Sequence, residues 1–386
     1  MPRRVAVLTG SRSEYGLLRY ILEGIRGAER LALDLIVTGS HLCPDAGMTV
    51  REIEVDGFVP AEKLPILFAD DGPAAIVKSM GVEMIALAGA FARRRPDVLL
   101  VVGDRYETFA AAAAAAAMGI PLVHLCGGET TEGALDEQWR HAITKLAHLH
   151  LPAIPAYARR LEQMGEEAWR IRVVGSPGLE AIRRHAPMTR EQLERELGLT
   201  AAPYLLVAYH PVTTAPEREA ARVEALLGAL DAAGQQVLVT GSNADAGGRA
   251  VSGRLEAWAH ARPFARFRAT LGSARYLSAL GHAAAIVGNS SSALIEAPSF
   301  ALPAVNVGAR QRGRVRAANV IDVGDSAAEI AAGIAHALAP EFRAGLAGLE
   351  NPYGDGLTSA RVVEALVALD PGPRLFEKRF VDHGAP

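Results

Sequence analysis

The sequence predicts an α/β protein built from two doubly wound domains. Short runs of β-branched and other apolar residues alternate with longer helical patterns along the chain, which is typical of parallel strands covered by helices. The alternation starts again near residue 204. A chain of 386 residues is also too long for one ordinary core, so two domains are expected.

In the first half we expect five strands and four helices. The strands cover residues 5–9, 32–37, 98–102, 121–125 and 173–174. The helices cover residues 15–27, 74–94, 108–118 and 136–146. The run from Ala110 to Ala117 is bounded by Asp104-Arg105 and by Gly119-Ile120-Pro121. Because alanine is a strong helix former but only weakly hydrophobic, this run predicts a packed helix rather than a membrane span.

The second half repeats the pattern. Strands are expected at 204–209, 236–240, 284–287 and 304–307, with helices at 216–233, 275–280 and 291–297. Between the halves, Thr189 caps a polar helix that runs through Leu197 in the linker region. The predicted domains are 1–185 and 186–365, followed by a C-terminal tail at 366–386. Ligands of such sheets bind beyond the carboxyl ends of the strands, so two facing domains predict a central cleft.

Composition narrows the possible partners and the compartment. Net charge is −3 and the isoelectric point is near 6.4, which gives no overall attraction to nucleic acid or to anionic membranes. The apolar residues 5–8 are too few for a signal peptide. Two cysteines, Cys43 and Cys126, are too few for a disulfide framework. A cytoplasmic protein with neither nucleic acid nor membrane as partner is therefore expected.

Several cofactor motifs are missing from the sequence. It contains neither the G-x-G-x-x-G fingerprint of dinucleotide-binding proteins nor a P-loop ending in Gly-Lys-Ser/Thr. No Cys or His pair has zinc-site spacing, and His141, His148 and His150 are poorly spaced for one helix face. We therefore expect no cofactor and no metal.

One loop predicts an anion site. Gly288-Asn289-Ser290-Ser291-Ser292 follows the apolar run 283–287 and opens into the predicted helix. Free N–H groups at a helix start attract phosphate, and the serine hydroxyls add donors. Glu296 lies about one and a half turns later, within reach of another polar group of the same ligand, such as a ribose hydroxyl. A serine cap followed by a solvated glutamate is the alternative interpretation.

Other polar loops share the same predicted sheet edges. They are 10–16, 103–107, 124–131, 210–214 and 241–243, each directly after an expected strand. Any one of them can be explained as a simple turn. The repetition of Arg, Asp, Glu and His at these edges instead predicts a ligand site.

These loops resemble the hydrolysing UDP-N-acetylglucosamine 2-epimerase family. The resemblance is carried from residue 10 to residue 356 by Gly10-Ser11-Arg12-Ser13-Glu14-Tyr15-Gly16, Gly103-Asp104-Arg105-Tyr106-Glu107, Gly127-Gly128-Glu129, Asp136-Glu137, Arg140-His141-Ala142-Ile143-Thr144-Lys145, Gly288-Asn289-Ser290-Ser291-Ser292, Glu296-Ala297-Pro298-Ser299-Phe300, Gln311-Arg312-Gly313-Arg314 and Asn351-Pro352-Tyr353-Gly354-Asp355-Gly356. It implies two Rossmann-like domains of the GT-B type with the active site between them.

The resemblance also implies a reaction. Hydrolysing members release UDP and a free mannosamine-type sugar on routes to sialic, legionaminic and related acids, from UDP-N-acetylglucosamine or its 2,4-diacetamido-trideoxy analogue. It further implies a homodimer or homotetramer. The alternatives are a non-hydrolysing 2-epimerase, a GT-B glycosyltransferase that uses a UDP-sugar, and a catalytically silent sugar-nucleotide sensor.

The implied chemistry makes two demands. In the first step UDP leaves C1 as a carboxylate removes the C2 proton, and in the second step water and a proton add to the resulting glycal. Hydrogen-bond donors must therefore stabilise the charge on the departing diphosphate, and acid–base groups must act near both faces of the sugar ring. For the diphosphate we expect Ser290, Ser291, His210, Arg12 and Arg312. The predicted catalytic residues are Asp104, Glu129, Asp136, Glu137 and His210. The rest of the predicted UDP-sugar site is Tyr15, Arg105, Gly241, Ser242, Asn289 and Glu296.

The sequence departs from the family pattern at one position. Some members carry a Glu two residues after the position of His124, where this chain has Cys126. If that Glu is catalytic in those relatives, Glu129 takes over its role here or the substrate subgroup differs.

Overall fold

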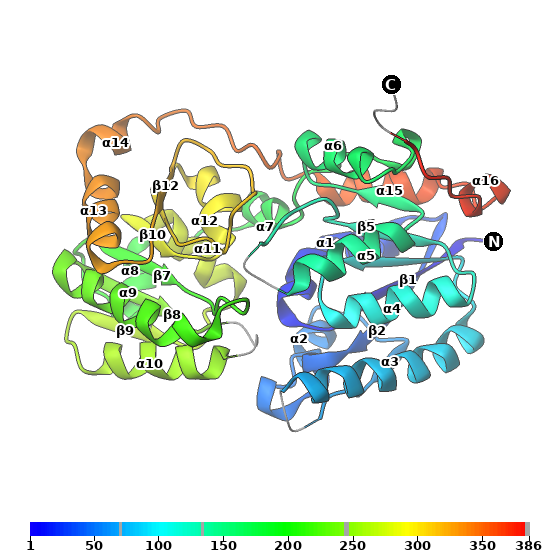
Figure 1. Ribbon diagram of the computed structural model, residues 1–386, viewed down its shortest axis with the longest axis horizontal. Coiled ribbons are helices and arrows are strands. Elements are labelled where there is room, and N and C mark those ends of the chain that lie inside the picture. The colour runs from blue at the N-terminus through cyan, green and yellow to red at the C-terminus, as the bar shows by residue number, and fades with distance from the viewer. Residues whose placement is uncertain (69–71, 133–134, 243–246, 383–386) are drawn as a thin grey trace. The chain divides into compact units, whose positions relative to one another are not determined.

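The chain forms two compact units, each built around a parallel sheet (Figure 1). The computed structural model describes residues 1–68, 72–132, 135–242 and 247–382. Unit 1 contains Met1–Glu129, Asp136–Ala181 and Tyr353–Pro386, and unit 2 contains Thr130–Leu135 and Ile182–Pro352. The predicted α/β class with two doubly wound domains is confirmed.

Unit 1 holds a six-stranded sheet in the order β3-β2-β1-β4-β5-β6. Its strands are β1 (Arg3–Thr9), β2 (Leu31–Thr38), β3 (Glu62–Leu64), β4 (Val98–Val102), β5 (Leu122–Leu125) and β6 (Leu149–Leu151). Its α-helices are α1 (Arg12–Gly27), α2 (Val50–Val55), α3 (Pro73–Arg94), α4 (Tyr106–Ala117), α5 (Asp136–Leu146), α6 (Pro155–Gln163), α7 (Gly178–Arg184, which crosses into unit 2), α15 (Thr358–Ala368) and α16 (Pro373–Phe376). Short 3-10 helices lie at η1 (Gly39–Leu42), η2 (Pro44–Ala46) and η3 (Ala168–Arg170).

Both faces of the unit 1 sheet are buried, as the residues of β1 illustrate. Val5 and Val7 belong to the core that also contains residues of α1 and α15. Ala6 and Leu8 belong to a second core that contains residues of α3, α4 and α5. Because each strand is covered on both sides, it reads as a continuous apolar run rather than an alternating one.

The predicted strand at 173–174 is wrong. β6 takes the edge position instead. The later segment meets it through an isolated bridge between His150 and Ile171, and the N–H groups of Val174 and Gly175 donate to the carbonyls of Pro152 and Ala153, just beyond β6. Gly175 turns the chain away with a φ of 88°.

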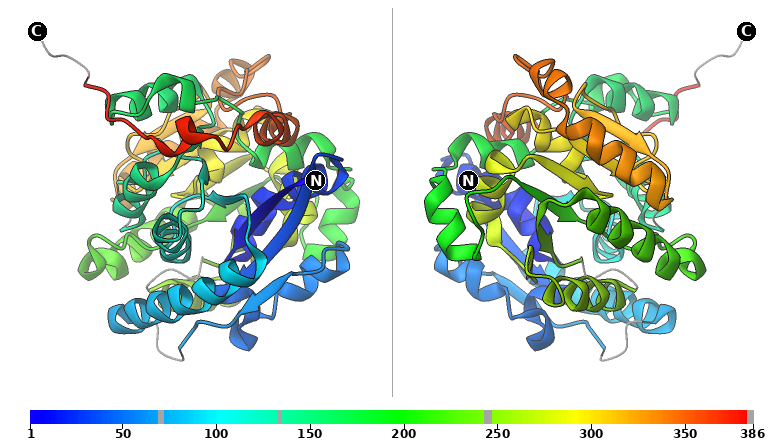
Figure 2. Two further views of the ribbon diagram at one scale, coloured as in Figure 1. Left: turned by 90° about the vertical axis from the view of Figure 1, so that its right-hand side faces the viewer. Right: turned by 90° about the vertical axis from the view of Figure 1, so that its left-hand side faces the viewer.

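The chain returns to unit 1 after residue 352, whereas the sequence analysis assigned residues up to 365 to the second domain. α15 packs against α1 and buries Leu366 completely, and Leu375 of α16 is also buried. Figure 2 shows this C-terminal segment in red beside elements of the first half of the chain. The segment predicted as a tail therefore supplies part of the unit 1 core up to α16.

Unit 2 holds a second parallel sheet in the order β12-β11-β10-β7-β8-β9. Its strands are β7 (Tyr204–Ala208), β8 (Gln236–Thr240), β9 (Ala265–Arg268), β10 (Ala285–Gly288), β11 (Ala304–Val307) and β12 (Val320–Val323). Its helices are α8 (Arg190–Leu197), α9 (Glu219–Ala233), α10 (Gly248–His260), α11 (Gly272–His282), α12 (Ser292–Ile295), α13 (Ala327–Leu338) and α14 (Pro340–Ala344), with 3-10 turns η4 (Pro216–Arg218) and η5 (Ala297–Phe300). Residues of α9, α10 and α13 join one core cluster with the strands.

Helix α8 begins as the sequence predicts. The Thr189 hydroxyl accepts from the backbone N–H of Gln192, and the Gln192 side chain accepts from the backbone N–H of Thr189. This reciprocal capping box satisfies two donors that the first turn leaves without helix partners. Gly198 then ends α8 in the left-handed conformation, with a φ of 71°.

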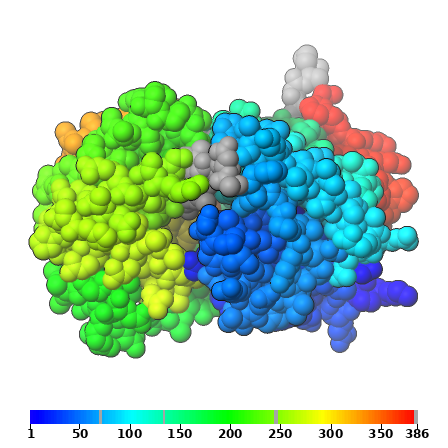
Figure 3. All heavy atoms as spheres, turned by 90° about the horizontal axis from the view of Figure 1, so that it is seen from below, coloured from blue at the N-terminus to red at the C-terminus, as the bar shows by residue number. Residues whose placement is uncertain are grey.

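By length and composition, helix α3 is long and apolar enough to cross a membrane. An 18-residue stretch of it has a mean hydropathy of 1.5, and 33% of that stretch is buried. It packs against α4, and its Glu83 points into unit 1 with no exposed surface. A membrane-spanning helix with a central buried carboxylate is costly. In this fold α3 is a covering helix, and its outer surface is visible in blue in Figure 3.

Glu83 makes the stability of unit 1 depend on pH. Neither carboxylate oxygen has a hydrogen-bond partner among the described residues. Burial raises the pKa of Glu83 well above 4.5, and the nearby Glu107 and Glu14 raise it further. Burial and Glu107 likewise raise the pKa of Glu14 to about 7.

We predict that Glu83→Gln stabilises the protein increasingly as pH rises above 4.5. The folded state keeps a proton that the unfolded chain has lost, so the wild type loses stability as pH rises through this window. Urea unfolding at pH 5 and pH 8 measures the effect, with the exposed Glu29→Gln as control. Equal gains at both pH values would contradict the prediction.

Candidate functional site

Each sheet has one point where its strand order reverses. In unit 1 the chain builds outward from β1 to β3 and then from β4 to β6 on the other side, so the loops after β1 and β4 diverge. In unit 2 the loops after β7 and β10 diverge in the same way. Such switch points are where doubly wound sheets hold ligands. Most of the predicted site residues follow these four strands.

Asp104, directly after β4, is held by an arginine of α5. The Arg140 guanidinium forms an ion pair with Asp104, and its Nη1 donates to Glu137 Oε2 at 2.9 Å. The Arg140 side chain is 3% exposed and that of Asp104 is 21% exposed. Glu137 also lies 3.3 Å from His141 Nε2. Two predicted catalytic carboxylates are therefore brought together on one buried cation.

Glu129 follows a tight turn after β5. Cys126 has a φ of 65° and Gly128 a φ of 77°. A Cβ on Gly128 would lie 2.5 Å from the Tyr157 carbonyl oxygen, and one on Gly127 would lie 2.9 Å from His124 Nδ1. Side chains at either glycine would therefore clash. A positive φ at a residue other than glycine, as at Cys126, is strained, and such strain is enriched at functional sites.

The chain leaves unit 1 after Glu129 and returns to it at Asp136. In unit 2, Arg314 Nε donates to the Thr130 carbonyl at 2.8 Å, and Thr130 Oγ1 donates to the Arg312 carbonyl at 3.3 Å. The Arg312 side chain itself is 70% exposed and lies 3.9 Å from Glu132. The main chain of Arg312 and the side chain of Arg314 therefore hold this segment.

The loop after β1 engages its polar groups within unit 1. Glu14 Oε2 accepts from the backbone N–H groups of Gly10 at 2.7 Å and Ser11 at 3.0 Å. Arg12 Nε donates to Glu52 at 3.0 Å.

Tyr15 and Arg105 are also engaged within unit 1. Tyr15 is 5% exposed, and its hydroxyl donates to Asp56 at 2.6 Å. Arg105 Nε donates to Glu107 at 3.2 Å. The predicted ligand roles of Arg12, Tyr15 and Arg105 stay predictions.

In unit 2, His210 and Asn289 clamp the switch point. The His210 N–H donates to Asn289 Oδ1 at 2.7 Å, and Asn289 Nδ2 donates to the His210 carbonyl at 2.8 Å. Asn289 has no exposed surface. Gly288 permits the close approach, because a Cβ there would lie 2.1 Å from the Ala208 carbonyl oxygen.

The His210 ring is neutral at physiological pH. It is 7% exposed, and burial together with the charge of Arg310 lowers its pKa to about 3. Its Nδ1 lies 3.4 Å from Ser242 Oγ. Nearby, Gln311 Nε2 and Arg310 Nη1 donate to the Asn289 carbonyl at 2.9 and 3.4 Å. The unit 2 switch point thus offers neutral donors and one cation.

The helix after the serine loop is much shorter than the predicted 291–297. α12 covers only Ser292–Ile295 and passes into the 3-10 turn η5, where Pro298 lacks a backbone N–H. A single turn carries little macrodipole. Ser290 Oγ accepts from the Ser292 N–H at 3.3 Å, Ser291 is half-buried, and Glu296 ends α12. Hydroxyl and backbone donors therefore remain, without the expected helix field.

The loop after β8 packs closely against the residues around Ala269 and Ser252. A Cβ on Gly241 would lie 2.6 Å from the Ala269 carbonyl oxygen, and the Ser242 N–H donates to Ser252 Oγ at 2.8 Å. Asn243, part of the predicted loop, lies outside the described residues. Across the described parts of the chain, His, Cys, Asp and Glu form no group of three or more able to hold a metal ion.

Four residues at the switch points were not predicted as site residues: Arg140, His124, Arg310 and Gln311. His124 is fully buried, and its Nε2 lies 2.8 Å from the Gly103 carbonyl, next to Asp104. The available signal was a charged residue on the inner side of an amphipathic helix, as Arg140 is on α5. Apart from the pair of Arg140 with Glu137 on α5, their partners lie 21 or more residues away, so the local pattern gave no pairing.

Comparison with known proteins places this geometry in context. The family model described as UDP-N-acetylglucosamine 2-epimerase matches residues 23–367. A Campylobacter jejuni protein named GDP/UDP-N,N'-diacetylbacillosamine 2-epimerase (hydrolyzing) is 38% identical over 83% of this chain and 84% of its own. A Legionella pneumophila protein named UDP-N,N'-diacetylbacillosamine 2-epimerase (hydrolyzing) is 35% identical over 98% and 99%.

The fold also matches solved structures. The Neisseria meningitidis UDP-GlcNAc 2-epimerase bound to UDP-GlcNAc superposes with a TM-score of 0.83, with 18% identity over 94% of this chain and 99% of that one. At this identity the likeness shows the shared fold alone.

We predict that Asn289→Ala lowers the free energy of unfolding of unit 2 by about 3 kcal/mol, because it leaves the buried N–H and C=O of His210 without partners. Urea unfolding followed by Trp258 fluorescence, with Trp139 and Trp169 replaced by Phe, reports on this unit. Gln235→Ala, in the turn before β8, is the control. A loss no larger than that of the control would contradict the clamp.

Proposed function

The chain belongs to the UDP-N-acetylglucosamine 2-epimerase family, and from this premise we propose that it is a hydrolysing 2-epimerase. It converts a UDP-activated 2-acetamido sugar and water to UDP and the free C2-epimeric sugar. The observation that carries the proposal is the 35% sequence identity, extending over 98% of the chain, with a relative named as a hydrolysing 2-epimerase. The carboxylates at the unit 1 switch point supply the acid–base groups that this reaction needs.

The reaction begins with loss of UDP. The C1–O bond breaks with its electron pair leaving on the diphosphate, and a carboxylate removes the C2 proton to give a glycal. Water then adds to C1, and a proton reaches the opposite face of C2. The atoms balance as substrate plus water to UDP plus free sugar, with no oxidant or cofactor.

We assign the diphosphate to the unit 2 switch point. Hydroxyls of Ser290 and Ser291, the Arg310 charge and the neutral His210 ring offer donors there. Preorganised donors of this kind stabilise charge that develops on a leaving group. Glu296, at the end of α12, remains the candidate for a ribose hydroxyl. Arg12 and Arg312 are further candidates for binding the diphosphate.

We assign proton transfer to unit 1. Asp104 follows β4, and the buried Glu129 follows β5. Glu137 lies at the start of α5. The ion pair with Arg140 fixes the orientation of Asp104, whose carboxylate is the proposed proton acceptor. Asp136 opens α5, where the chain re-enters unit 1. Cys126 cannot replace a carboxylate, so Glu129 is the acid–base candidate of this loop.

We propose UDP-N,N'-diacetylbacillosamine, a 2,4-diacetamido-trideoxy sugar nucleotide, as the preferred substrate. The two relatives at 38% and 35% identity carry this sugar in their names. A place on a route to legionaminic acid or a related acid follows from that choice. UDP-N-acetylglucosamine is the competing substrate.

We further propose a cytoplasmic homodimer or homotetramer. Cys43 and Cys126 do not form a disulfide with each other. On α3, Val77 is 67% exposed and Ile85 is 77% exposed. Exposed aliphatic side chains on one helix suit contact with a second copy.

We predict that Asp104→Asn lowers turnover about 100-fold or more while UDP binding is unchanged, because an acid–base group is lost without a change of shape. Steady-state kinetics and calorimetric titration with UDP measure the two effects. Asp97→Asn is the matched control: Asp97 precedes β4, and its side chain accepts from the Arg4 N–H at 2.7 Å. Normal turnover in folded Asp104→Asn would remove Asp104 from the mechanism.

We predict that, in deuterated water without any acceptor, the protein releases UDP and a free sugar with deuterium at C2. Mass spectrometry and proton NMR detect the label, and parallel reactions with the two UDP-sugars compare kcat/KM. A higher kcat/KM is expected for UDP-N,N'-diacetylbacillosamine. Turnover that needs an added acceptor would support a glycosyltransferase, and an epimeric UDP-sugar product would support the non-hydrolysing reaction.

A further inference from the structure

A lysine near the C-terminal end of the described chain reaches the end of α5. Lys378 Nζ donates to the backbone carbonyls of Thr144 at 3.0 Å, Lys145 at 2.9 Å and Ala147 at 2.8 Å. The last carbonyls of a helix have no intrahelical partners, and a cation there also complements the helix dipole. Lys378 is therefore a C-terminal cap for α5 supplied from more than 230 residues away.

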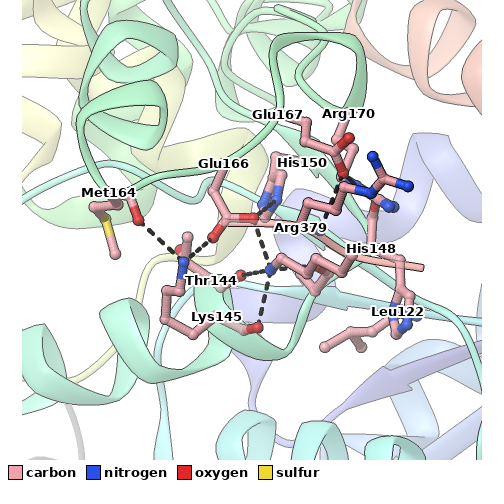
Figure 4. Close-up of polar contacts among 12 residues, drawn as sticks. Leu122, Thr144, Lys145, His148, His150, Met164, Glu166, Glu167, Arg170 and Arg379 are labelled. Atoms are coloured by element: carbon pink, nitrogen blue, oxygen red, sulfur yellow. Dashed lines mark hydrogen bonds and ion pairs between the residues drawn. The ribbon is translucent and has the colours of Figure 1, made fainter. Parts of the chain in front are cut away.

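The same ammonium group is tied to a buried carboxylate. Glu166 has no exposed surface, and its Oε2 lies 2.6 Å from Lys378 Nζ and 2.9 Å from His150 Nε2. Its Oε1 lies 2.6 Å from Lys145 Nζ. Figure 4 shows Lys145 and His150 converging on Glu166. Burial alone would raise the pKa of Glu166, but the hydrogen bonds from His150, Lys145 and Lys378 lower it to about 2.

The opposite end of α5 carries the candidate acid–base groups. Glu137 and Arg140 lie in its first half, and Arg140 holds Asp104. In its second half, Thr144 lies beneath the turn that leads to Glu129, since a Cβ on Gly127 would be 3.5 Å from Thr144 Oγ1. A displacement of α5 would therefore shift the surroundings of Asp104, Glu129 and Glu137 together.

We propose that Lys378 is a positioning residue for the reaction: by capping α5 and binding Glu166, it holds the helix where Arg140 and Glu137 meet Asp104. This inference rests on the proposed function for its catalytic consequence. The clamp itself can be measured without substrate.

Other contacts hold the segment, so loss of the Lys378 charge need not unfold it. The buried Arg170 donates to the carbonyls of Leu375 at 2.8 Å, Arg374 at 3.1 Å and Glu377 at 3.2 Å. The Val381 N–H donates to the Gly165 carbonyl at 3.0 Å. Arg379, by contrast, contributes its backbone N–H to Glu167 and has an exposed side chain. It is the matched control on the same segment.

The test compares Lys378→Met, Lys378→Arg and Arg379→Met in the full chain. Hydrogen exchange of residues 136–146, measured without substrate, reports on α5. Steady-state kinetics gives kcat and KM, and calorimetry gives the UDP dissociation constant. Lys378→Met should speed exchange in α5 and lower kcat about tenfold or more, since small misplacements of catalytic groups are costly. UDP affinity should not change, Lys378→Arg should recover part of kcat, and Arg379→Met should match the wild type.

Two results would overturn the proposal. One is wild-type exchange in α5 together with wild-type kcat in Lys378→Met. The other is an equal loss of kcat and UDP affinity in Lys378→Met and Arg379→Met, which would indicate general destabilisation. If Lys378→Met does not fold, Phe380→Ala replaces it. Phe380 belongs to the same segment as Lys378, and its ring lies against Gly165, the residue before Glu166. If the wild type turns over neither UDP-sugar, the proposed function fails, while the exchange data still decide whether Lys378 clamps α5.

Discussion

Burial of both faces of each sheet is the constraint on which the rest of the structure depends. Once helices cover both sides of the strands, polar side chains with a chemical role have room only at the strand ends. The reversal of strand order then opens a gap between diverging loops, after β1 and β4 in unit 1 and after β7 and β10 in unit 2. Asp104 and His210 occupy these gaps because they are among the first polar residues after β4 and β7.

Charges brought to these buried edges need partners, and the partners define the geometry. Arg140 is almost inaccessible, and its buried charge is compensated by Asp104 and Glu137. Asn289 satisfies both backbone groups of His210 in the same way without any charge. Glu83 is the contrasting case: no described group bonds its carboxylate, so it is stable in the interior only when it holds a proton. Paired groups thus fix the site, whereas the unpaired one makes folding sensitive to pH.

The sequence predicts the class of fold well because apolar periodicity is local information. It misses four strands that do not look like covered strands, because each is short and carries charged or polar residues. They are Glu62–Leu64 (β3), Leu149–Leu151 (β6), Ala265–Arg268 (β9) and Val320–Val323 (β12). It overestimates the helix after Ser291, where Pro298 forces a 3-10 turn. The candidate carboxylates could be named from their positions after strands, but Arg140 and Lys378 could not. Their partners lie 36 residues and more than 200 residues away, and only the folded chain brings them together.

The two units divide the proposed chemistry by how their groups titrate. At the unit 2 switch point the buried His210 has a pKa of about 3, and arginine and serine do not titrate near neutral pH. The proposed diphosphate donors therefore keep the same protonation state around neutral pH. The proposed proton-transfer groups of unit 1 are carboxylates, and α5 forms part of their surroundings. An elimination needs both properties: a leaving-group site that is constant and an acid–base site that exchanges protons. Under the proposed mechanism, unit 1 is where proton exchange takes place, and the ion pairs of Arg140 with Asp104 and of Lys145 with Glu166 connect α5 to its surroundings there.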